Sequence, residues 1–209
     1  MDFDEITRTR RAVNFFDRNR EVPQELLDRM ITLAARAPSS FNLQPWRLMV
    51  VQDPEEKARL RKLAWDQPKV TDAPVALIVL ADKTGWQAGN PTLEKNWSEM
   101  VKSGAMEEGQ RDGFLDAAKS LYGWSPEASL AFAVKNAAFF AMGLMYAATS
   151  LGLDTHPMDG FDHEGVRKAF GISGDYWVPL LLAVGYRDPR AETAPPKWRK
   201  SVAETTGGG

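Results

Sequence analysis

No residue between Asn136 and Leu153 carries a charge, and this stretch constrains the fold more than any other part of the sequence. It continues a helical pattern that begins at Ser125, where a capping serine, a first-turn proline and an acid follow one another. A membrane span needs about 20 predominantly apolar residues. This stretch is rich in alanine, is interrupted by glycine, threonine and serine, and continues from the charged Lys135. We therefore expect a helix buried on all sides in a protein core, with small residues suited to packing against a second subunit.

Other hydrophobic patterns predict the remaining elements. Short apolar runs predict strands at residues 47–51, 75–81 and 179–186. Amphipathic patterns with capping residues predict helices at 4–11, 23–34, 53–65 and 162–170. The segment 154–161 (DTHPMDGF) is predicted as a loop, because proline and glycine interrupt regular structure. We expect one α+β domain over residues 1–206, with helices around a mixed or antiparallel sheet, a variable lid or insertion at 82–125 and a frayed tail at 207–209.

Charge and composition exclude several classes of function. The 26 basic and 28 acidic residues give a net charge of −2, which provides no field to attract nucleic acid or an anionic membrane. Cysteine is absent, which excludes disulfides and thiolate chemistry. The two histidines, His156 and His163, are too few for a histidine-rich metal site, and we expect each to be structural or to face solvent. With no basic, apolar leader at the amino terminus, we expect a cytoplasmic protein.

The segment 37–46 (APSSFNLQPW) is a polar loop with two possible roles. Its two prolines oppose regular helix, and Ser39, Ser40, Asn42 and Gln44 place four hydrogen-bonding side chains within ten residues. Such a loop can bind a ligand that carries many hydroxyl groups. The alternative is a capped turn between a helix and a strand, and the loop chemistry alone does not separate the two.

A basic cluster near the amino terminus also has two interpretations. Arg8, Arg10 and Arg11 occupy three of four positions and can hold a phosphate. The same cluster can instead be a solvated turn that pairs with nearby carboxylates, which is the commoner fate of exposed charges. Neither a GxGxxG nor a GxxxxGK pattern is present, so the two common nucleotide-binding loops lack their central residues.

Four segments, taken together and in order, resemble the nitroreductase family of flavin mononucleotide (FMN) enzymes, and in particular its oxygen-insensitive bacterial branch. They are residues 10–17 (RRAVNFFD), 38–46 (PSSFNLQPW), 157–161 (PMDGF) and 197–199 (KWR). Their order and spacing match throughout, and segment 38–46 is the most specific. The resemblance implies the nitroreductase-like fold, in an interlocked homodimer with two flavin sites at the interface.

The resemblance implies a phosphate clamp made of Arg10, Lys197 and Arg199. A dianionic phosphate requires fixed cations, and guanidinium groups can bind it through two hydrogen bonds. Further cofactor contacts fall at Arg11, Ala12, Asn14, Pro38, Ser39, Ser40 and Asn42. In the family the loop that carries the two serines, here residues 38–46 and called the serine loop below, comes from the partner subunit. The site therefore depends on the dimer.

The flavin ring has its own set of implied contacts. Lys69 resembles a lysine near the pyrimidine end, where a cation stabilises the charge of the reduced ring. Asp66 falls where the family often has an amide, and its carboxylate can accept the ring N3–H. The loop over one ring edge matches Pro157, Met158, Asp159 and Gly160. Asn14 stands where many relatives carry a second cation, and Asp159 where they often carry glutamate.

The implied activity is hydride transfer from NAD(P)H through flavin N5 to a nitroaromatic, quinone or enone acceptor, in ping-pong order. No side chain need act as an acid or base, and no metal is required. Phe41, Phe114 and Trp124 are candidate walls of the acceptor cleft, although core packing explains them equally well. The alternatives are another reaction on the same cofactor, such as dehalogenation, flavin fragmentation or aldehyde reduction, and a flavin-binding or sensing module without turnover.

Overall fold

A four-stranded antiparallel sheet lies at the centre of this computed structural model, which describes residues 1–192 and 195–207. The strand order is β1-β2-β4-β3, and every pair is antiparallel. The strands are β1 (Trp46–Val51), β2 (Val75–Asp82), β3 (Asp154–Met158) and β4 (Tyr176–Gly185). All eight residues of β2 are buried, as expected for a wholly apolar run in the middle of a sheet covered on both faces. The α+β prediction is confirmed, and the sheet is antiparallel throughout.

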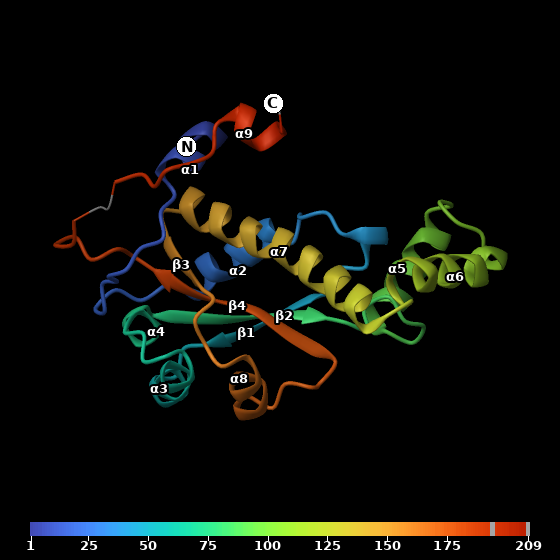
Figure 1. Ribbon diagram of the computed structural model, residues 1–209, viewed down its shortest axis with the longest axis horizontal. Helices are drawn as coiled ribbons and strands as arrows, with labels where there is room; N and C mark the ends of the chain where they lie inside the picture. Colours follow the sequence, from blue (N-terminus) through green and yellow to red (C-terminus); the bar gives the residue numbers. More distant parts are fainter. Residues whose placement is uncertain (193–194, 208–209) are drawn as a thin grey trace.

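Helices cover both faces of the sheet (Figure 1). One face packs against α2 (Gln24–Ala34) and the long α7 (Pro126–Ser150), and the other against α3 (Pro54–Leu63) and α8 (His163–Ala169). The remaining helices are α1 (Phe3–Thr9), η1 (Ser40–Asn42), α4 (Lys69–Asp72), α5 (Pro91–Lys102), η2 (Glu108–Gln110), α6 (Arg111–Tyr122) and α9 (Val202–Thr206). In Figure 1, α5 and α6 extend from the sheet beyond one end of α7. They occupy the region expected to form a lid, and that role stays a prediction.

Within a single chain, helix α7 is not buried on all sides, so the predicted complete burial would require a second subunit. Its inner face, including Asn136 and Leu144, is fully buried, whereas Phe139 is 46% exposed. By length and composition α7 could cross a membrane, but it packs against α2 and all four strands of the sheet. The cytoplasmic location stays a prediction.

The segment predicted as a loop at 154–161 instead begins with strand β3, so that prediction is wrong for residues 154–158. The loop prediction was based partly on Pro157, because proline lacks the N–H that a central strand needs. β3 lies at the edge of the sheet, where proline is tolerated. The free edge of β3 is covered by the segment after α1, in which Ala12 bridges Thr155 in parallel. At the other end of the chain, residues 208 and 209 of the expected tail lie outside the described residues.

Candidate functional site

A cavity of about 890 Å³ lies between the end of α1, the segment that covers β3 and the C-terminal segment. Six residues predicted to bind the cofactor line it, namely Arg10, Arg11, Ala12, Asn14, Lys197 and Arg199. Arg8 and Arg187 bring its basic side chains to six, against one acidic residue among the described ones, Glu192. The structure therefore brings together the cations that the sequence places at opposite ends of the chain.

The backbone around α1 accounts for this arrangement. Helix α1 ends at Thr9, and the N–H of the capping residue Arg10 donates to the Ile6 carbonyl. The chain then runs alongside β3, with a 3.0 Å hydrogen bond from Val13 N to Thr155 O. That pairing fixes the direction in which residues 10–14 face the cavity. Lys197 and Arg199 reach it from the extended segment after β4.

Arg11 provides the sharpest indication of what the cavity accepts. Its Nη1 donates to the Arg8 and Arg10 carbonyls at 2.6 and 2.9 Å, but its Nε is buried without a partner. It is the one such side-chain atom in the part of the chain that the structure describes. A buried N–H without an acceptor is costly, and a guanidinium can satisfy it best with an oxyanion. The residues present thus fit a phosphate group.

Lys69 lies on the first turn of α4, close to the cavity-lining residues 10–14. Its Nζ lies 3.3 Å from Asn14 Oδ1 and 3.2 Å from His156 Nε2. Burial lowers the pKa of Lys69 from its ordinary value. The sequence predicts only a structural or solvent-facing role for His156, which lies 87 positions from Lys69 along the chain. No local pattern could have revealed this contact.

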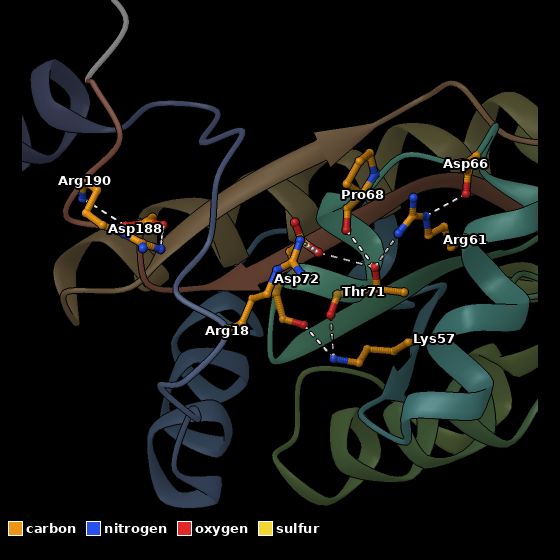
Figure 2. Close-up of polar contacts among 10 residues, drawn as sticks. Arg18, Lys57, Arg61, Asp66, Pro68, Thr71, Asp72, Asp188 and Arg190 are labelled. Atoms are coloured by element: carbon orange, nitrogen blue, oxygen red, sulfur yellow. Dashed lines mark hydrogen bonds and ion pairs between the residues drawn. The ribbon is translucent and has the colours of Figure 1, made fainter.

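Asp66 is paired with a cation rather than isolated. Its carboxylate accepts a 2.7 Å hydrogen bond from Arg61 Nε, and Arg61 also donates to the Thr71 hydroxyl at 3.1 Å (Figure 2). Lys57, which is also on α3, donates to the carbonyl of Ala73 at 2.8 Å, directly after the end of α4. The segment that carries Asp66 and Lys69 is thus anchored at both ends by side chains of α3.

The segment predicted to cover one edge of the ring, residues 157–160, begins in the last two residues of β3 and continues beyond the strand. Met158 is buried in the core, whereas Asp159 is exposed. The Gly160 carbonyl accepts a 2.8 Å hydrogen bond from Gln67 Nε2. A Cβ on Gly160 would lie 2.8 Å from the ring of Trp65, closer than real Cβ contacts, so a larger residue here would require this exposed ring to move.

The serine loop does not meet the cavity within this chain. Ser40 N donates to Asn136 Oδ1 at 3.0 Å, ten residues before Tyr146, which lines the cavity. At about 1.5 Å per residue, that separation is about 15 Å along α7. The loop also contains non-glycine residues in the left-handed region, namely Phe41, Asn42 and Gln44. Asn96, which is buried on α5, bonds to the Asn42 side chain and the Phe41 carbonyl.

The candidate aromatic residues have different environments. Phe114 is buried, and its ring lies against those of Phe41 and Trp97. Trp124 is 73% exposed and Phe41 is 39% exposed. The structure therefore places Phe114 in the core, and it brings Phe41 but not Trp124 against it.

Residues 7–186 match the family model described as "Nitroreductase family". The chain belongs to the nitroreductase family. Among relatives of this nitroreductase, the NADH dehydrogenase of Thermus thermophilus is 33% identical and aligns over 85% of this chain and 82% of its own. The "CLA biosynthesis enone reductase" of Lactiplantibacillus plantarum is 28% identical, over 88% and 85% of the two chains.

A solved structure carries the same fold together with a ligand. It is a protein from Exiguobacterium sibiricum 255-15 in complex with FMN, with a TM-score of 0.84 and 29% identity. The alignment covers 98% of this chain and 96% of that one. The fold prediction is confirmed by this likeness, whereas the individual contacts predicted for this nitroreductase stay predictions.

Proposed function

We propose that this nitroreductase is an FMN-dependent NAD(P)H oxidoreductase that reduces nitroaromatic, quinone or enone acceptors in two successive half-reactions. The observation that carries the proposal is the cation-lined cavity, in which Arg11 Nε is a buried donor without a partner. Family membership and the FMN complex of a relative with 29% identity support the same cofactor. The enone reductase relative supports enones as one acceptor class.

FMN, when bound, would accept a hydride from NAD(P)H and deliver it to the acceptor. The side chains would bind and orient the cofactor and need supply no acid or base. Arg10, Lys197 and Arg199 would neutralise the phosphate, with Arg11 Nε as an additional donor. Lys69 would place a positive charge near the ring, where it favours the reduced state. The pairing of Asp66 with Arg61 offsets the negative charge that an aspartate adds at that position.

We further propose that the working enzyme is an interlocked homodimer. Within one chain the serine loop and the cavity lie near different parts of α7, so a loop that contacts the cofactor would have to come from the partner subunit. Exposed apolar side chains support a second copy, because α7 exposes Phe139 and the C-terminal segment exposes Trp198 and Val202 by 73% and 79%. Sedimentation of the purified protein tests this directly, and a monomer at micromolar concentration would contradict it.

The cofactor assignment is tested by removing two cations at once. Arg10→Ala combined with Lys197→Ala should give a folded protein that purifies without flavin colour. The matched control is Lys62→Ala with Lys168→Ala, two exposed lysines on α3 and α8, which should retain FMN. Retention of stoichiometric FMN by the first double variant would refute the phosphate clamp.

The acceptor class is tested separately. Anaerobic NADPH or NADH should bleach the bound flavin, and addition of a nitroaromatic, a quinone or an enone should restore its colour. Persistent yellow colour with both nucleotides would refute the oxidoreductase proposal and favour a flavin-binding module.

A further inference from the structure

His156 connects three segments that would surround the cofactor. Its Nε2 contacts Lys69, its Nδ1 lies 2.9 Å from the Val13 carbonyl, and the next residue in the chain is Pro157. Val13 and Asn14 line the cavity, so the imidazole, which β3 carries, connects the cavity wall with the lysine of α4. No other described side chain bonds to Lys69 except Asn14.

The hydrogen bonds assign the tautomer of His156. A carbonyl oxygen only accepts, so the Val13 contact requires the proton on Nδ1. Nε2 of the neutral ring then carries a lone pair, and the Lys69 ammonium, which only donates, can bond to it. The arrangement is satisfied when the imidazole is neutral and the lysine is charged. A second proton on Nε2 would set two donors and two positive charges against each other.

Charge and burial favour this assignment. Burial, together with the nearby positive charge of Lys69, lowers the pKa of the His156 imidazole, and the hydrogen bond to Val13 opposes them weakly. Among the described residues, Lys69 is the charged group that acts on this ring, since Val13 and Asn14 contribute a carbonyl and an amide. The ring therefore stays an acceptor through the neutral pH range.

We propose that His156 is a positioning residue, whose neutral Nε2 holds the Lys69 ammonium in place beside Asn14 and releases it when the ring is protonated. The consequence for the reaction rests on the proposed function, in which Lys69 lies near the flavin ring. A held ammonium gives a fixed favourable charge at the reduced cofactor, whereas a released one is solvated and contributes less.

The contact itself is tested in the protein without cofactor. Nitrogen NMR of the two histidines should show His156 with its proton on Nδ1 and a pKa below that of an ordinary histidine. Lys69→Met should raise the pKa of His156, because it removes the neighbouring charge, and should leave His163 unchanged as an internal reference. An unchanged His156 titration in Lys69→Met would overturn the proposal.

The consequence is tested in the FMN-loaded protein by the midpoint potential of the flavin. His156→Leu should disfavour reduction about tenfold, equivalent to about 30 mV for a two-electron couple. His156→Gln retains an acceptor that does not titrate. It should restore the wild-type potential at neutral pH, and on acidification it should leave only the pH dependence of the flavin's own proton uptake, without the additional fall that protonation of His156 causes in the wild type. The control His163→Gln should keep the wild-type profile. Equal potentials for the Leu and Gln variants would refute the positioning role. Failure of the wild-type protein to bind FMN would instead refute the proposed function, and it would leave the NMR result unaffected.

Discussion

Replacement of Asn136 by alanine tests how the serine loop is held. The Asn136 side chain is fully buried, accepts a 3.0 Å hydrogen bond from Ser40 N and donates a 2.7 Å bond to the Phe132 carbonyl. Phe132 belongs to the same helix as Asn136. In the alanine variant the Ser40 N–H would lose its buried acceptor. At about 1 kcal/mol per hydrogen bond, plus about 1 kcal/mol for the unpaired N–H, we expect a loss of about 3 kcal/mol of unfolding free energy.

The same change should alter the shape of the loop. Left-handed geometry costs a non-glycine residue about 1 kcal/mol or more, so Phe41, Asn42 and Gln44 together store about 3 kcal/mol. That strain is comparable with the interaction that Asn136 provides, so its removal should let the loop relax. We therefore expect FMN to bind at least tenfold more weakly to Asn136→Ala.

Two measurements check this prediction. Urea denaturation of the cofactor-free protein should show the loss of stability, and the midpoint of thermal unfolding should fall by about 6–12 °C. Titration with FMN, followed by quenching of its fluorescence, should show the loss of affinity. The control is Lys135→Ala, an exposed neighbour on α7. A loss below about 1 kcal/mol with unchanged FMN affinity would refute the proposed role of this side chain.

Three further changes have definite expected outcomes. Gly160→Ala should displace the Trp65 ring that lies 2.8 Å from the added Cβ, which would change the tryptophan fluorescence and weaken FMN binding; unchanged fluorescence would contradict the close contact. The pKa of His156 is lowered on folding, so the unfolded state binds the proton more tightly. The free energy of unfolding should therefore be greatest above about pH 6.5 and should fall as the pH drops below that value. Urea denaturation at several pH values should show a smaller loss in His156→Gln. Lys57→Met should cost about 1–3 kcal/mol of unfolding free energy, because it removes the charged donor to the Ala73 carbonyl, and equal stability to wild type would show that burial of the lysine offsets its bond.

Much of the fold follows from local patterns in the sequence. The apolar run at β2 and the capped start of α7 are local signals, and both elements form where expected. The strand at β3 was missed, because the acceptability of Pro157 depends on its place at the sheet edge, which only the tertiary structure determines. The four-residue helix α4 is too short to show a period.

The candidate site divides in the same way. Arg10 and Lys197 were predicted through a family resemblance, and the chain folds so that both line one cavity. The contact of Lys69 with His156 depends on how β3 packs beside α4, and no spacing in the sequence indicates it. The serine loop cannot be placed against the cavity from one chain, whatever the sequence predicts, because its position along α7 separates the two.

The left-handed residues of the serine loop determine when its conformational entropy is lost. Two buried asparagines, Asn96 and Asn136, hold the loop in a shape that these residues would not adopt freely. If the loop contacts the cofactor as proposed, folding rather than ligand binding would order the chain there. Such preorganisation lowers the entropic cost of association and favours high affinity from few contacts.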